Sequence, residues 1–124
     1  MTARAASSWF AVEQVGPLTV VRFGDVGFPE DEAVAEVRER LFDLVDREGR
    51  RQFLLRFGRV RGLASRILGQ LVALHHKLQA VGGRLVLCEV SPSLYEFFET
   101  AKLPGVLCIR DGEDEALKAL TSAP

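Results

Sequence analysis

Residues 53–78, FLLRFGRVRGLASRILGQLVALHHKL, contain in succession an apolar run, a short loop and a helical pattern. The run FLLRF at 53–57 predicts a strand that is buried on both faces. Ser65 lies where the helix begins, and a helix start offers free backbone N–H groups and a partial positive charge to an anion or a phosphorylated side chain. Gly82-Gly83 is predicted to end this helix. The helix itself is predicted by apolar residues three or four apart: Ile67, Leu71, Leu74, Leu78 and Val81.

Outside this stretch, strands and helices are predicted by alternating apolar residues, helical periodicity and turn or capping residues. The order is β-β-α-β-α-β-α-β-α, which predicts an α/β fold with a mixed, mostly parallel sheet packed with helices. We expect a flexible tail at 1–9 and one domain at 10–121. The further segments are strands at 10–15 and 18–23, a helix from Pro29 to Gly49, a strand at 84–88, a helix opened by Ser91-Pro92, a strand at 106–109, and a last helix that Asp111 caps.

The bulk composition limits the classes of function. The chain has 124 residues and a net charge of −1, so it is long enough for an apolar core and is not a general binder of nucleic acid or membranes. No apolar run is long enough for a signal peptide or a membrane span, so we expect a cytoplasmic protein. Cys88 and Cys108 lie in apolar runs and are interpreted as small buried residues, although a disulfide stays open if their strands are neighbours.

The charges are unevenly distributed along the chain. Residues 49–88 contain eight Lys and Arg and no Asp or Glu. Arg59, Arg61 and Arg66 surround Ser65, and they form either a solvated basic edge or a surface for an acidic partner or anion. Arg50 and Arg51 follow a predicted helix end and are interpreted as ordinary surface charge.

No catalytic, cofactor or metal site is predicted. His75 and His76 are adjacent, so on a helix they point about 100° apart, a poor geometry for one metal ion. The acidic clusters at 30–32 and 111–115 lie at predicted helix starts, where the helix dipole explains them. No phosphate-binding glycine loop and no nucleophile–base pair can be assembled from the sequence, so we expect no enzyme.

The ordered set of segments resembles the STAS family, the domain of bacterial anti-sigma-factor antagonists and of sulfate-transporter tails. The resemblance covers about residues 10–120. Where family members show a loop D-S-S-G-L-G before a helix, residues 64–69 read ASRILG, so Leu68 and Gly69 keep the pattern. The later landmarks, a Gly-Gly, an apolar strand and a P-x-x-x-x-x-F helix, match AVGGRLVLCEVSPSLYEFFETAKL at 80–103.

The resemblance implies a non-enzymatic partner switch. In antagonists of this family, the serine that matches Ser65 is phosphorylated by an anti-sigma factor that is also a kinase, and phosphorylation releases this partner. Two departures concern the loop itself: Ala64 replaces the aspartate, and Arg66 replaces the second serine. The resemblance places partner binding, to an anti-sigma factor or related serine kinase, on the following residues: Arg59, Arg61, Gly62, Ala64, Ser65, Arg66 and Gly69.

Two alternatives remain open at this point. Ala64 and Arg66 are also compatible with a constitutive scaffold or homo-oligomeric subunit, including a homodimer, in which phosphorylation plays no part. The same helix start could instead hold a small anion or nucleotide. Ser65 could also act only as a helix cap, which contributes about 1 kcal/mol to stability, and this role is compatible with a regulatory one because a capping serine can be phosphorylated.

Overall fold

The computed structural model describes residues 10–23, 31–58, 60, 65–103 and 105–121. Its element order is the predicted one, so the order of strands and helices read from the sequence is confirmed. The elements are β1 (Phe10–Val15), β2 (Leu18–Phe23), α1 (Asp31–Asp46), β3 (Gln52–Arg56), α2 (Ser65–Ala80), β4 (Arg84–Cys88), α3 (Pro92–Thr100), β5 (Cys108–Arg110) and α4 (Glu113–Thr121).

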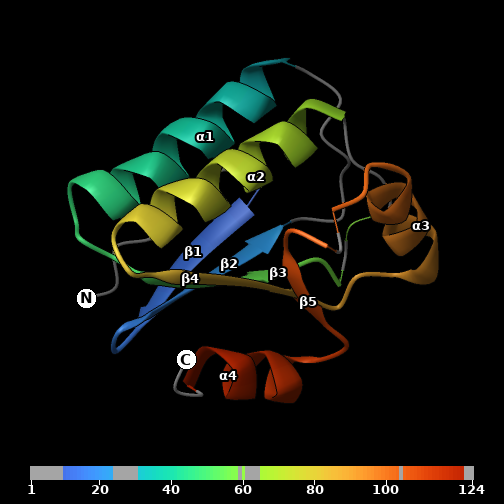
Figure 1. Cartoon of the computed structure of the whole chain (residues 1–124). Coiled ribbons are helices and arrows are strands. Elements are labelled where there is room, and N and C mark those ends of the chain that lie inside the picture. The colour runs from blue at the N-terminus through green and yellow to red at the C-terminus, as the bar shows by residue number, and fades with distance from the viewer. Residues whose placement is uncertain (1–9, 24–30, 59, 61–64, 104, 122–124) are drawn as a thin grey trace.

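The five strands form one mixed sheet in the order β1-β2-β3-β4-β5. The first pair is an antiparallel hairpin, and each later pair is parallel. Because a parallel connection must cross the sheet, a helix lies between each pair of parallel strands in the sequence. Helices α1 and α2 cover one face of the sheet and α4 lies against the other, while α3 lies beyond the end at which the parallel strands finish (Figure 1).

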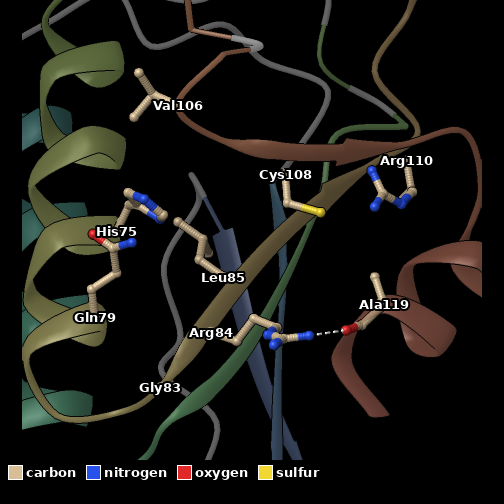
Figure 2. Close-up of a pocket in the computed structure, with 9 residues that line it drawn as sticks. All are labelled: His75, Gln79, Gly83, Arg84, Leu85, Val106, Cys108, Arg110 and Ala119. Carbon is tan, nitrogen blue, oxygen red and sulfur yellow. Dashed lines mark hydrogen bonds between the residues drawn. The ribbon is translucent and has the colours of Figure 1, made fainter. Parts of the chain in front are cut away.

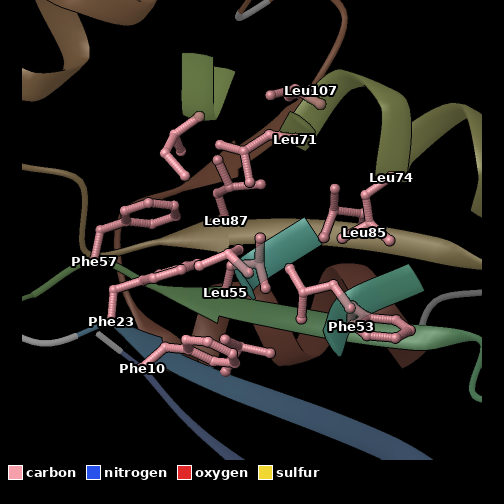
Figure 3. Packing of buried hydrophobic residues seen from close by; sticks show 14 of the residues in the cluster. Phe10, Phe23, Phe53, Leu55, Phe57, Leu71, Leu74, Leu85, Leu87 and Leu107 are labelled. Carbon is pink, nitrogen blue, oxygen red and sulfur yellow. The ribbon is translucent and has the colours of Figure 1, made fainter. Parts of the chain in front are cut away.

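The larger apolar core fills the space between the sheet and helices α1 and α2 (Figure 3). Four phenylalanine rings continue it across the end of the sheet, with centroids 6.3 Å apart for Phe10 and Phe23, 5.0 Å for Phe23 and Phe57, and 6.1 Å for Phe57 and Phe98. A smaller cluster packs β2, β3 and β4 against α4: Val20, Leu54, Val86, Cys88, Ala116 and Leu120. Since Leu54 and Leu55 are both 0% exposed, the prediction of a strand buried on both faces is confirmed.

Two predicted helix boundaries have the expected capping contacts. Helix α2 ends in a left-handed turn at Gly82, whose φ is +75°, and the N–H of Gly83 donates to the carbonyl of Leu78 at 2.7 Å. The hydroxyl oxygen of Ser91 accepts a hydrogen bond from the N–H of Leu94 at 3.2 Å, which caps α3.

Three local predictions are wrong at their ends. Val81 is 39% exposed because α2 ends at Ala80, so it does not extend the apolar stripe. The last strand occupies 108–110 rather than 106–109. Helix α4 begins at Glu113, so Asp111 does not directly precede it, and its carbonyl instead accepts from the N–H of Glu89 at 3.3 Å.

Candidate functional site

The candidate site lies at the edge of the sheet where the parallel strands finish. Strands β2 to β5 end there at Phe23, Arg56, Cys88 and Arg110, and α2 begins on the same side with Ser65 as its first residue (Figure 1). In open α/β sheets, binding sites form outside the carboxyl ends of the strands, because the connecting loops and helix starts meet there. The fold therefore places the backbone of Ser65 at the edge where these strands end and α2 begins.

The structure brings three of the seven predicted residues onto the first two turns of α2. Ser65 and Arg66 form the start of the helix, and Gly69 follows in the next turn with an exposed backbone. Ser65 and Gly69 are four residues apart, so their backbone positions share one side of the helix. Arg59, Arg61, Gly62 and Ala64 lie outside the described residues, and their roles stay predictions.

The start of α2 is firmly attached to the core. Ile67, Leu68 and Leu71 are 0%, 7% and 1% exposed, and they pack into the larger apolar cluster directly after the first turn. The first turn contains no acidic residue. The partial positive charge of the helix terminus is therefore not offset by a carboxylate within its own turn.

A second feature of this edge was not predicted from the sequence: an ion pair between the ends of β3 and β4. The Arg56 guanidinium donates from Nε to Glu89 Oε1 at 3.1 Å and from Nη2 to Glu89 Oε2 at 2.8 Å. Its Nη1 also lies 3.7 Å from Glu113 Oε2, at the start of α4. These hydrogen bonds lower the pKa of Glu89 and raise the pKa of Arg56, although partial burial opposes both shifts.

The Glu89 carboxylate also contacts the beginning of the segment that leads to Ser65. Glu89 has a φ of +60°, an unfavourable backbone conformation for a residue with a side chain. A Cβ added at Gly58 would lie 2.9 Å from Glu89 Oε1, so a larger residue at this position would displace the carboxylate. Strained backbone of this kind persists only where surrounding contacts hold it, and here the bidentate pair with Arg56 does so.

Backbone hydrogen bonds fix the same segment as far as Val60. The N–H of Phe57 donates to the carbonyl of Cys88 at 3.0 Å, and the N–H of Val60 donates to the carbonyl of Phe57 at 3.0 Å. The Val60 side chain is 5% exposed and belongs to the larger core. The chain thus leaves β3 along a defined path beside Glu89, and Ser65 resumes the described structure five residues later.

The acid-free stretch at 49–88 is not uniformly unpaired basic surface, because half of its cations are engaged by other groups of the fold. Arg50, interpreted from the sequence as surface charge, instead ties down the β1–β2 hairpin, donating to Thr19 Oγ1 at 2.8 Å and to the carbonyls of Gly16 and Leu18 at 2.8 and 2.9 Å. Arg56 is paired with Glu89. Lys77 donates to Asp46 at 2.9 Å, and Arg84 donates to the carbonyl of Ala119 at 2.6 Å.

The two histidines lie side by side on α2. Their ring centroids are 5.6 Å apart and the rings are tilted by 46°. Burial, with a smaller effect of the neighbouring His76 charge, lowers the pKa of His75. Within residues 10–121 as far as the structure describes them, no three His, Cys, Asp or Glu side chains gather as metal ligands, and no helix has the length and apolar character to cross a membrane. Cys88 and Cys108 are both free thiols.

The model of the STAS domain matches residues 31–116, well over half of the sequence. The chain therefore belongs to the STAS domain family. A search among curated proteins finds no match to it.

Solved structures of low sequence identity share the fold. The Thermotoga maritima protein TM1081 superposes with a TM-score of 0.82 at 18% identity, over 91% of this chain and 95% of that one. An anti-sigma factor antagonist from Mycobacterium paratuberculosis gives 0.79 at 18% identity, over 91% and 93%. The anti-sigma factor antagonist SpoIIAA from Bacillus, in its unphosphorylated form, gives 0.73 at 22% identity, over 92% and 99%. At these identities the likeness establishes the α/β STAS fold.

Proposed function

We propose that this chain is a non-enzymatic, cytoplasmic regulator that acts as an anti-sigma factor antagonist-like partner switch. It binds an anti-sigma factor or a related serine kinase through segment 58–66 and the first two turns of α2, with Ser65 as the switch residue. The observation that carries this proposal is that Ser65 is the first residue of α2, at the carboxyl edge of a STAS sheet. The structures of SpoIIAA in unphosphorylated and phosphorylated forms support it by analogy of fold.

The proposed switch is local in its physical basis. A phosphate on Ser65 adds a charge of about −1.5 to −2 at the positive end of the helix dipole, so the fold accommodates it with little rearrangement. Buried Ile67 and Leu68 hold the first turn of α2 in place before and after the modification. A partner surface shaped for a neutral serine, in contrast, loses affinity by charge repulsion and by the cost of desolvating the phosphate.

The loop departs from the family pattern at two positions, and both enter the proposal. Ala64 removes the carboxylate that would stand beside a phosphoserine, and Arg66 adds a cation one residue after it. Fewer negative charges and one more positive charge both favour a dianionic phosphate at Ser65. We therefore assign Arg66 to the stabilisation of the phosphorylated form, and Arg59, Arg61, Gly62 and Gly69 to the partner contact.

The test is affinity capture from a lysate of the native organism, with bound proteins identified by mass spectrometry. Wild-type protein is compared with Ser65→Asp, and Ser91→Asp serves as the matched control. Ser91 is also a serine at a helix start on the same side of the sheet, and aspartate retains its capping oxygen. We expect an anti-sigma factor or serine kinase to be captured by wild type and by Ser91→Asp and to be lost with Ser65→Asp.

The same experiment separates the proposal from the scaffold alternative, which Ala64 and Arg66 motivate. If Ser65→Asp captures the same partners as wild type, Ser65 is not a switch and the protein acts as a constitutive binding module or oligomer subunit. Light scattering of the purified protein then reports whether that module is a dimer. Incubating the captured proteins with ATP provides a second readout, in which the peptide containing Ser65 gains a phosphate in wild type and not in Ser65→Ala.

A further inference from the structure

A pocket lies beside the outer half of β4, away from the start of α2. Strand β5 pairs with Val86–Cys88, so the β4–β5 pairing does not extend to Arg84 and Leu85 at the beginning of β4. An open pocket of about 450 Å³ occupies this place (Figure 2). Figure 2 shows His75 and Gln79 projecting from α2 on one side of it and Cys108, Arg110 and Ala119 on the other.

The polar side chains around this pocket are mainly hydrogen-bond donors. Arg84 and Arg110 carry guanidinium groups, Gln79 offers an amide, and none of the described lining residues is acidic. The guanidinium of Arg84 is anchored by its hydrogen bond to the carbonyl of Ala119, which ties β4 to α4 and holds one cation at the wall of the pocket. His75 also lines the pocket, and burial lowers its pKa, which disfavours the charged imidazolium.

The remaining wall is apolar. Leu85 and Ala119 line the pocket with Val106, a large apolar side chain that is 42% exposed. Apolar walls with a few convergent polar groups, in a volume of about 300–1,000 Å³, are typical of small-molecule sites. The combination fits a compact ligand that has an anionic head and an apolar or planar body.

We propose that this pocket is a binding site for a small organic anion, a carboxylate or phosphate ester, held by Arg84 and Arg110 against the apolar wall of Leu85 and Val106. The site is separate from the proposed partner switch. His75 and Gln79 follow Ser65 by ten and fourteen residues, so they lie roughly 15–21 Å further along α2. The proposal therefore does not depend on the role of Ser65.

Cys108 provides a reporter inside the pocket. Its thiol is free and half-buried among the lining residues, whereas Cys88 is fully buried. Burial, with the nearby Glu89 charge, raises the pKa of Cys88 to about 11, so Cys88 stays unreactive in the folded protein. The Cys108 thiolate displaces iodide from iodoacetate or iodoacetamide, and the two reagents differ mainly in that iodoacetate is an anion.

The first experiment compares the rates at which iodoacetate and iodoacetamide alkylate Cys108, measured by peptide mass spectrometry. Arg110 is two residues from Cys108 in the strand, about 7 Å away, so Arg110→Gln should lower the iodoacetate-to-iodoacetamide ratio by about threefold at low salt. Arg47→Gln is the matched control, because Arg47 is a strongly exposed arginine in the turn after α1, outside the pocket. An unchanged ratio in Arg110→Gln would overturn the proposal.

The second experiment asks whether anions protect Cys108 from the neutral reagent. Benzoate and phenyl phosphate are added to wild type and Arg110→Gln, and alkylation by iodoacetamide is followed. We expect saturable protection in wild type that weakens severalfold in the variant. Protection by phenyl phosphate alone assigns the site to phosphate esters, protection by benzoate alone assigns it to carboxylates, and protection by neither compound refutes an anion site.

Discussion

Alanine substitutions at Gly69, Gly82 and Gly83 should change stability by very different amounts, although each adds the same methyl group. Gly69 lies inside α2, and an added Cβ would meet nothing within 4 Å. Gly82 also has open space around it, but its φ is +75°. At Gly83 the added Cβ would collide with the carbonyl oxygen of Arg51 and lie 2.9 Å from Leu78 Cδ2.

The magnitudes follow from these three environments. Gly69→Ala should raise the free energy of unfolding by about 1 kcal/mol, because alanine favours an exposed helix interior by that amount over glycine. Gly82→Ala should lower it by about 1 kcal/mol. The left-handed conformation costs alanine ~1–2 kcal/mol, and the lower conformational entropy of the unfolded variant offsets part of this cost. Gly83→Ala should lower it by about 3 kcal/mol, since the Arg51 carbonyl also accepts from Arg84 and the β3–β4 pairing must shift.

Equilibrium unfolding in urea, followed by far-ultraviolet circular dichroism, measures these differences on all four proteins. With an m-value of about 2 kcal/mol per molar urea, each kcal/mol moves the midpoint by about 0.5 M. The urea midpoint is expected to be highest for Gly69→Ala and then to fall in the order wild type, Gly82→Ala and Gly83→Ala. A Gly83→Ala variant as stable as wild type would refute the inferred close approach of Gly83 to the Arg51 carbonyl. A Gly69→Ala variant less stable than wild type would refute the open environment of Gly69.

Three further substitutions test single contacts. Glu89→Gln should reduce the loss of stability on acidification, because stability from a carboxylate with a lowered pKa is present above its unfolded pKa and is lost as the pH falls through its folded pKa. Urea midpoints at pH 7 and pH 3 measure this loss, with the exposed Glu13→Gln as the control. Equal pH dependence in wild type and Glu89→Gln would contradict the prediction. Ser91→Ala should lower the free energy of unfolding by about 1 kcal/mol through loss of the α3 cap, and Ser91→Asp should not. Phe57→Ala should lower the free energy of unfolding by about 3–5 kcal/mol, because the Phe57 ring contacts both Phe23 and Phe98. A smaller loss in Phe57→Ala than in Ser91→Ala would show that these ring contacts contribute little.

The predictions that the structure confirms depend on signals that act within a few residues. The stop of α2 needs only Gly82-Gly83 after the last helical turn, and the cap of α3 needs only Ser91 three residues before the N–H of Leu94. Burial of Leu54 and Leu55 follows from a continuous apolar run. The errors at Val81 and Asp111 concern the last residue of an element, where propensity differs little between helix and turn.

The candidate site was only partly visible from the sequence. Ser65 at a helix start could be read directly, because helical periodicity begins just after it. The pair of Arg56 and Glu89 could not, since 33 residues separate them and no spacing rule connects them. The interpretation of Arg50 as surface charge failed for the same reason, because its acceptors belong to a hairpin more than thirty residues earlier.

The sequence by itself therefore determined the order of strands and helices, the end of α2, the cap of α3 and the burial of β3 on both faces, since periodicity and capping depend on neighbours along the chain. Tertiary structure alone decided which charged groups meet. Parallel pairing of β3 and β4 sets Arg56 beside Cys88 and so within reach of Glu89. The short β5 leaves the beginning of β4 open, and this opening forms the pocket of Arg84, Cys108 and Arg110. Register and strand length place these residues together, and both depend on the packing of the whole sheet.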